Sequence, residues 1–247
     1  MSEDDPNPPP LDPPPPEGGG EEGPEPVPAA EPSTPWEDQR RLGLATAFVE
    51  TTRRVLLTPA AFFRAMPTTR ALGAPLAYGL VVGMLGIVAS WIYLFVFQTT
   101  LRPALGTLGG HDVLEQLLPA FQGGVTLVLQ ILFAPIGLIV RLFVTAGIVH
   151  IALLLLGGAA RGFEATFRVI AYGEAPAVLG ILPFCGELAA IPYRVVVLII
   201  GLSEAHGTSR GTAAAAVLIP IGLACCCCGT VIGLGVYFFA AALGLSR

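Results

Sequence analysis

The chain has 247 residues, of which 53% are hydrophobic and only 13% are charged, and its net charge is −5. Soluble domains carry about 25% charged residues, so this composition excludes an ordinary water-soluble domain and indicates lipid as the surrounding medium. Residues 1–38 hold eleven acidic residues and no arginine, whereas the rest of the chain holds all thirteen arginines and seven acidic residues. There is no lysine, and the usage rich in arginine, alanine, glycine and proline indicates a GC-rich bacterial genome.

Residues 1–38 are predicted to form an acidic, proline-rich N-terminal tail. Thirteen of the first 35 residues are proline, with glycine and glutamate between them and almost no large apolar side chain. Such a segment cannot bury enough apolar surface to offset the entropy that folding costs. We expect a disordered tail with polyproline II character, and the alternative is a docking ligand for a proline-binding module.

Residues 39–72 are predicted to form amphipathic helices next to the membrane. Five arginines alternate with leucine, valine and phenylalanine between residues 40 and 64, without an apolar run long enough to cross a bilayer. This pattern is typical of helices that lie in the membrane interface. Pro59 and Pro67 should divide the region into short pieces, because proline interrupts helices. The alternative is that these helices pack on the end of the bundle itself.

Residues 73–245 contain the apolar runs from which we predict about five transmembrane helices. A helix needs about 20 apolar residues to cross the hydrocarbon core. The second run is too short for two spans, so it forms one long helix or a re-entrant segment followed by a span. We therefore expect an all-α integral membrane protein, in which a disordered proline-rich N-terminal tail is followed by a bundle of about five transmembrane helices. The predicted spans cover residues 74–97, 125–156, 169–185, 188–203 and 213–244.

The distribution of arginine predicts the orientation in the membrane. With five spans, nine arginines lie on the N-terminal side of the membrane and two, Arg102 and Arg247, lie on the other side. Arginine is enriched in cytoplasmic loops, and splitting the second run into two spans would weaken this asymmetry. We therefore expect a multi-pass protein of the bacterial inner membrane, with a cytoplasmic N-terminus and an external C-terminus.

Five ionisable side chains in or near the predicted spans are the candidate functional residues: Arg141, His150, Glu174, Glu187 and Arg194. Ionisable residues inside membrane helices are costly, so they either pair as contacts between helices or line a proton or ion pathway. We favour contacts between helices. Helical rise places His150 and Glu174 at matching depths near the inner side, which predicts an inner pair. The remaining three lie nearer the outer side, which predicts an outer cluster.

Two Gly-x-x-x-Gly patterns are candidate positions for close helix packing. Gly79 and Gly83 lie in the first predicted span, and Gly229 and Gly233 lie in the last. Glycine lets helix backbones approach closely, because it has no side chain to hold them apart. We expect intramolecular packing at both patterns rather than homodimerisation.

The sequence predicts no catalytic centre, no metal site and no cofactor. It contains no nucleophile elbow, no His-Glu-x-x-His motif and no phosphate-binding glycine loop ending in lysine. Cys225 and the three cysteines after it point about 100° apart on a helix, so they cannot converge on one metal ion, and we interpret them as small apolar residues of the span. Nucleic-acid binding is not expected, since the soluble tail is acidic and the arginines near the membrane suit anionic lipid.

Three stretches in order along the chain carry a family resemblance. They are LLTPAAFFRAMP (56–67) followed by PLAYGL (75–80), AYGEAPAVLGILP (171–183) and YRVVVLIIGLSEAHGTSRGTAAAAVLIP (193–220). Together they resemble the bacterial type of the Yip (Ypt/Rab-interacting protein) family of five-span membrane proteins, over residues 40–245. The resemblance implies a role in helix shaping and packing for Pro59, Phe63, Tyr172, Pro176, Gly201 and His206.

The same resemblance implies a cytosolic N-terminal region, a short external C-terminus and a role in membrane organisation or partner binding. Eukaryotic relatives bind prenylated Rab GTPases and help vesicle trafficking, but a bacterium has no Rab cycle, so only the architecture and a scaffold role carry over. No catalytic residue carries over, because the family is not known as enzymatic. The expected partners are the lipid bilayer and a protein at the cytoplasmic face. The alternative function is a small transporter or channel that uses Arg141, His150, Glu174 and Arg194.

Overall fold

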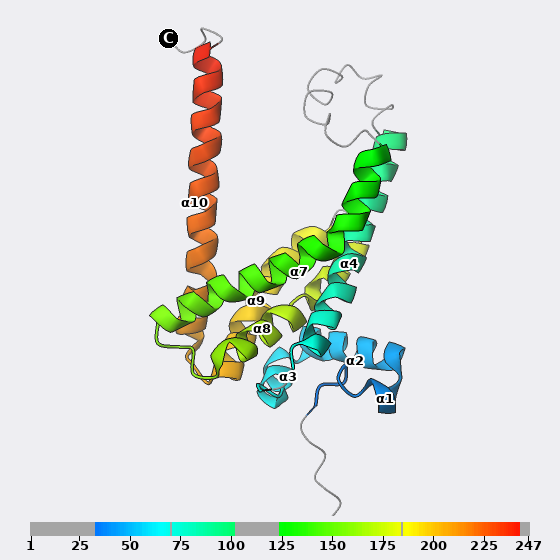
Figure 1. Cartoon of the computed structure of the whole chain (residues 1–247), viewed down its shortest axis with the longest axis vertical. Coiled ribbons are helices and arrows are strands. Elements are labelled where there is room, and N and C mark those ends of the chain that lie inside the picture. Colours follow the sequence, from blue (N-terminus) through cyan, green and yellow to red (C-terminus); the bar gives the residue numbers. More distant parts are fainter. Residues whose placement is uncertain (1–32, 70, 102–123, 184, 243–247) are drawn as a thin grey trace, which may run out of the picture. The chain divides into compact units, whose positions relative to one another are not determined.

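The computed structural model describes residues 33–69, 71–101, 124–183 and 185–242. Within these ranges every regular element is a helix (Figure 1). Helices suit apolar segments in lipid, because a helix satisfies its backbone hydrogen bonds internally where no water is present to do so. The predicted tail up to residue 32, together with Arg102 and Arg247, lies outside the described residues.

Three short helices form the N-terminal part of the described chain. They are α1 (Gln39–Leu42), α2 (Leu44–Leu57) and α3 (Pro59–Ala65). Gly43 separates α1 from α2 with a φ of 77°, a conformation that favours glycine. Pro59 begins α3, because the first turn of a helix tolerates a residue without an N–H donor.

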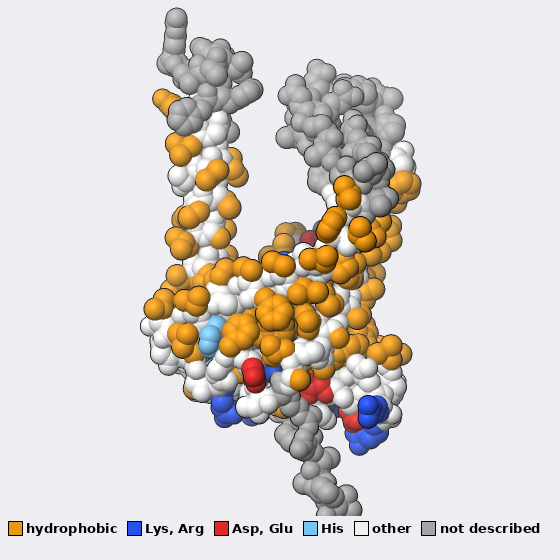
Figure 2. Space-filling model, in the orientation of Figure 1, with side chains coloured by type: hydrophobic (Ala, Val, Ile, Leu, Met, Phe, Trp, Pro, Cys, Tyr) orange, Lys and Arg blue, Asp and Glu red, His pale blue; other side chains and the backbone are white. Residues whose placement is uncertain are grey.

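Four helices in the described part of the chain are long and apolar enough to cross a bilayer. They are α4 (Gly73–Val96), α7 (Gly124–Leu155), α9 (Cys185–His206) and α10 (Arg210–Ala242). Many of their large apolar side chains are exposed, and Figure 2 shows hydrophobic side chains along the visible lengths of α4, α7 and α10. Such a surface is stable only in contact with lipid. The chain is therefore an all-α, multi-pass membrane protein.

The second apolar run forms one continuous helix, α7, rather than a re-entrant segment followed by a span. Pro135 lies inside it without ending it. The π-helical turn η1 (Phe97–Leu101) continues α4 at its far end. Of the two possibilities that the length of this run allowed, the structure shows the single long helix.

The predicted third span, residues 169–185, is not a single helix. It is divided into α8 (Gly162–Tyr172) and the 3-10 helix η3 (Ala175–Ile181). Residues 165–172 of α8 are all buried, so protein rather than lipid surrounds them. The described residues therefore offer four candidate spans, and the predicted count of five is not confirmed. Apolar composition alone does not separate the two environments, because a helix buried in protein can be as apolar as one buried in lipid.

The first Gly-x-x-x-Gly pattern lies where α4 meets α7 and α8. A Cβ atom on Gly79 would lie 3.1 Å from Leu142 Cδ1 of α7, and one on Gly83 would lie 2.5 Å from Leu138 Cδ2. A methyl group on Gly83 would therefore force the side chain of Leu138 to shift, and one on Gly79 would make an unusually tight contact. The predicted intramolecular packing is not seen for the second pattern, because no described atom lies within 4 Å of a Cβ placed on Gly229 or Gly233.

Residues 34–38 pack into the bundle, although the sequence pattern assigned them to the disordered tail. Trp36 is 4% exposed, and its Nε1 donates a hydrogen bond of 2.7 Å to the backbone oxygen of Ala74. The carboxylate of Glu37 forms an ion pair with Arg168 of α8, whose side chain is fully buried. The folded part of the chain therefore begins before residue 38. We call residues 34–38 the N-terminal latch.

The ion pair between Glu37 and Arg168 predicts that Glu37→Gln destabilises the protein. The substitution leaves a buried guanidinium without its counter-charge, which costs about 3 kcal/mol of unfolding free energy. Denaturant unfolding of the purified protein in detergent measures the change. The control is Asp38→Asn, which breaks only a solvent-exposed ion pair with Arg41 and should change the unfolding free energy by less than about 0.5 kcal/mol. Equal stability of the two variants would contradict the role of the latch.

The packing of α4 predicts different effects at the two glycine patterns. Gly83→Ala should lower the free energy of unfolding by about 1–3 kcal/mol, because the new methyl group overpacks the contact with Leu138. Gly233→Ala should leave stability unchanged or raise it slightly, because alanine is the better helix former and meets open space. The same unfolding measurement on both variants tests this, and a larger loss at Gly233 would show that α10 has a packing partner.

Candidate functional site

Three charged side chains from separate elements meet inside the bundle. Arg141 of α7 places its Nη2 atom 2.8 Å from Oε2 of Glu174, which lies between α8 and η3. Arg194 of α9 contacts the same carboxylate oxygen through its own Nη2. The Nε of Arg194 also donates a hydrogen bond of 3.4 Å to the backbone oxygen of Gly173. We call Arg141, Glu174 and Arg194 the arginine–glutamate cluster.

The break between α8 and η3 positions the carboxylate of this cluster. Gly173 ends α8 and passes so close to α9 that a Cβ atom there would lie 2.5 Å from Leu198 Cδ2. Pro176 then lies in the first turn of η3. Glu174 is the next residue after this close approach to α9, and its carboxylate contacts Arg194 of that helix.

The carboxylate is the most deeply buried member of the cluster. The side chain of Glu174 is 4% exposed, whereas that of Arg194 is 28% and that of Arg141 is 44% exposed. A buried charge is tolerated when it is paired, and polar contacts of this kind hold helices together inside a membrane. The cluster thus connects α7 and α9 through the short segment that joins α8 to η3.

The structure corrects the prediction that His150 pairs with Glu174. The Nδ1 atom of His150 lies 2.9 Å from Thr166 Oγ1, which in turn lies 2.9 Å from Nε2 of His206. The depth argument failed because two residues at the same depth can point to different sides of their helices. Glu174 belongs instead with the arginines of the predicted outer cluster.

His150, Thr166 and His206 form a hydrogen-bonded network, which we call the histidine network. The backbone N–H of Arg161 donates to His206 Nδ1 at 3.1 Å, so this nitrogen carries no proton. In a neutral His206, Nε2 then donates to Thr166, whose hydroxyl donates to Nδ1 of His150. The network joins α7, α8 and α9. Sequence analysis missed Thr166, because no spacing rule marks a threonine as the bridge between two distant histidines.

Two cavities adjoin the arginine–glutamate cluster, with volumes of about 240 and about 310 Å³. Ala177 and Glu187 line both of them together with the three charged residues. Glu187 is exposed, and in the described structure its carboxylate forms no ion pair with either arginine of the cluster. The structure therefore brings all the residues of the predicted outer cluster to one place, but only two of them form ion pairs there.

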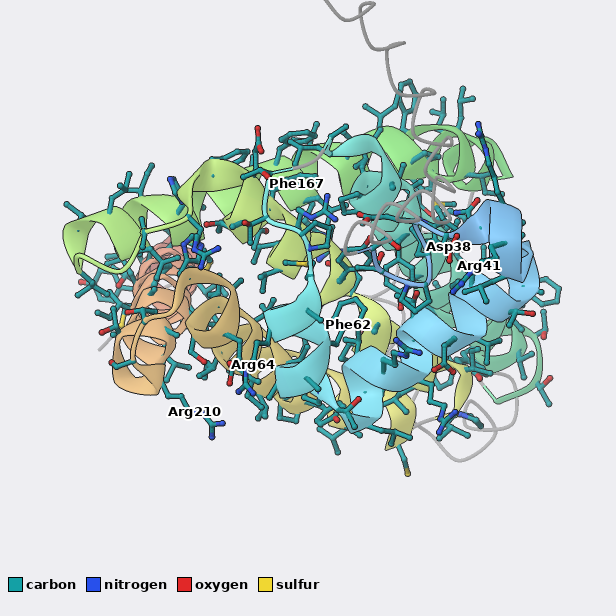
Figure 3. The ribbon with its side chains drawn as sticks, turned by 90° about the horizontal axis from the view of Figure 1, so that it is seen from below. Asp38, Arg41, Phe62, Arg64, Phe167 and Arg210 are labelled. Atoms are coloured by element: carbon teal, nitrogen blue, oxygen red, sulfur yellow. The ribbon has the colours of Figure 1, made fainter. Side chains whose placement is uncertain are left out.

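A groove of about 480 Å³ lies between residues 33–35 and the helices α2 and α3. Its charged rim includes Glu50, Arg53 and Arg54, and we call it the α2–α3 groove. The Nε of Arg54 donates a hydrogen bond of 2.7 Å to Glu50, and this bond holds the pKa of the Glu50 carboxyl below its usual range. Figure 3 views the molecule from this side. The apolar part of the groove is formed by Leu57, Ala61, Phe62, Ala65 and Met66.

The residues singled out by the family resemblance lie at helix starts and packing contacts. Pro59 begins α3, and Phe63 approaches Gly201 so closely that a Cβ atom on the glycine would lie 3.0 Å from its ring. Tyr172 shares a hydrogen bond of 2.9 Å with Thr34 of the N-terminal latch. These positions agree with a role in shaping and packing the bundle. The members that are buried are Phe63, Tyr172, Pro176, Gly201 and His206.

Comparison with known proteins gives one match. The family model of the Yip1 domain matches residues 53–243, which is more than half of the chain. No curated protein and no solved structure matches the chain. The matched region includes α4, the arginine–glutamate cluster and the histidine network, and it begins within α2.

The cluster predicts that Glu174→Gln lowers the free energy of unfolding by about 3 kcal/mol, because two guanidiniums lose their shared counter-charge. The matched control is Glu187→Gln, which alters an exposed carboxylate beside the same cavities and should change stability by less than about 0.5 kcal/mol. Denaturant unfolding in detergent compares the two variants. An unchanged Glu174→Gln protein would show that the cluster does not hold the helices together.

Proposed function

The chain belongs to the Yip1 domain family, and we propose that it is a non-enzymatic membrane scaffold that binds a protein partner at the cytoplasmic face of a bacterial inner membrane. The family match and the apolar helices make it a multi-pass membrane protein. The observation that carries the proposal is the α2–α3 groove, an accessible mixed surface at the end of the molecule where arginines gather.

The arginines support the cytoplasmic placement of this end. Figure 2 shows basic side chains at the lower end of the molecule, away from the exposed apolar lengths of the helices, and Figure 3 labels Arg41, Arg64 and Arg210 there. Arginine is retained on the cytoplasmic side of bacterial membranes. A groove at this end would therefore face cytosolic proteins. The exposed arginines of α1, α2 and α3 are Arg40, Arg41, Arg53, Arg54 and Arg64.

The chemistry of the α2–α3 groove supports a protein as the partner. Leu57 is 71% exposed although charged residues surround it, and a large apolar side chain in such a place is typical of a binding surface. Phe62 and Met66 provide an apolar floor, while Arg53 and Arg54 provide charge at the rim. A partner with a large apolar side chain flanked by acidic residues would fit this groove, because its apolar side chain would contact the floor and its acidic residues would pair with the arginines. Protein interfaces commonly have such an apolar centre and polar rim.

The arginine–glutamate cluster supports a scaffold over the alternative of a transporter or channel. A carboxylate that moves protons or ions has to exchange partners during the cycle. Glu174 is instead held by two guanidiniums at once, which favours a fixed contact between helices. A rigid bundle that presents a cytoplasmic groove is what a scaffold requires.

A quantitative pull-down tests the proposal. We expect the full chain, purified in mild detergent, to capture a cytoplasmic protein, and Leu57→Glu to lower its recovery about tenfold or more, because the substitution places a charge in the apolar part of the groove. The control is Val49→Glu, an equally exposed position of α2 outside the groove, which should retain normal capture. Equal recovery with all three proteins, or no captured protein, would contradict the proposal.

A further inference from the structure

The guanidinium of Arg141 has more N–H donors than its one contact uses. It carries five N–H groups, and in the described structure Glu174 Oε2 is the acceptor that it meets. Nearly half of its side chain is exposed, and it lines both cavities beside the arginine–glutamate cluster. Arg194 lines the same two cavities. Both guanidiniums can therefore donate hydrogen bonds to a molecule that enters from the cavity side.

The charges of the cluster do not balance. The two guanidiniums and the buried carboxylate of Glu174 leave one positive charge. The exposed carboxylate of Glu187 also lines both cavities, but in the described structure it forms no ion pair with either arginine. Excess charge between membrane helices is costly unless an opposite charge or water compensates it. An anion bound between the guanidiniums would remove that excess and use their free donors, since guanidinium recognises oxyanions through pairs of hydrogen bonds.

Apolar side chains line part of each cavity. The smaller cavity includes Ile170, Ile191, Leu198 and Ile221, contributed by α8, α9 and α10. The larger one includes Ile87 and Trp91 of α4 and shares the charged residues of the cluster with the smaller one. Apolar walls around a few convergent polar groups are typical of binding sites for small molecules. A ligand that fits both parts has a charged end and a hydrocarbon end.

We propose that these cavities bind one amphiphile, with its anionic headgroup between Arg141 and Arg194 and its acyl chain along the apolar wall. The headgroup chemistry is that of an oxyanion, which a lipid phosphate and a fatty-acid carboxylate share. Both ligands are available to a protein in a membrane. This site is separate from the α2–α3 groove, so it does not depend on the proposed scaffold function.

Native mass spectrometry of the full chain in detergent tests the site with four probes. Lysophosphatidic acid and oleate have an acyl chain and an anionic headgroup, lysophosphatidylcholine has a chain without net charge, and inorganic phosphate has charge without a chain. We expect one molecule of an anionic amphiphile to bind, about tenfold or more tightly than the other two probes. The tighter of lysophosphatidic acid and oleate identifies the headgroup. Equal binding of lysophosphatidylcholine or of inorganic phosphate would overturn the proposal.

Two variants locate the binding. Arg141→Gln should weaken binding of the anionic amphiphile about tenfold or more, whereas Arg210→Gln, an exposed arginine outside the cavities, should bind normally. Thr145→Leu keeps all the charges and fills part of the smaller cavity, so it should weaken binding even if Arg141→Gln fails to fold. Normal binding by Thr145→Leu would place the ligand elsewhere and contradict the proposal.

Discussion

The carboxylate of Glu174 has to be paired because it lies almost wholly buried between membrane helices. Arg141 and Arg194 both contact its Oε2 atom, so a single oxygen connects α7 and α9 to the junction of α8 with η3. Gly173 ends α8 one residue before this carboxylate. Two open cavities adjoin this contact.

A second buried pair ties the N-terminal end to the bundle. Glu37 neutralises the fully buried Arg168. Trp36 is buried, and its indole N–H donates a hydrogen bond to the backbone oxygen of Ala74 in α4. The latch therefore forms one wall of the α2–α3 groove, the surface that we propose for partner binding. Thr34 and Pro35, which line the groove, are therefore next to the residues that tie the N-terminal end to the bundle.

The depth of a residue in the membrane did not predict which side chains contact each other, because those contacts depend on how the helices pack. Matching depths suggested a pair of His150 with Glu174, but His150 contacts Thr166, and Glu174, which lies between α8 and η3, pairs with Arg141 and Arg194. His150 joined Thr166 and His206, which the sequence separates by 40 residues. The α8–η3 segment shows the same limit, because its apolar composition fits burial in protein as well as burial in lipid.

The sequence by itself predicted the helical class and the membrane environment, and four of its five predicted spans coincide with long apolar helices of the described chain, because hydropathy over about 20 residues is a local property. It also marked Arg141, Glu174, Glu187 and Arg194, since a charge in an apolar run stands out without any structure. Only the tertiary structure decided which charges pair, that α8 is enclosed by protein, and that residues 34–38 belong to the fold. Those outcomes depend on the rotation of each helix and on contacts between distant segments, which no local pattern records.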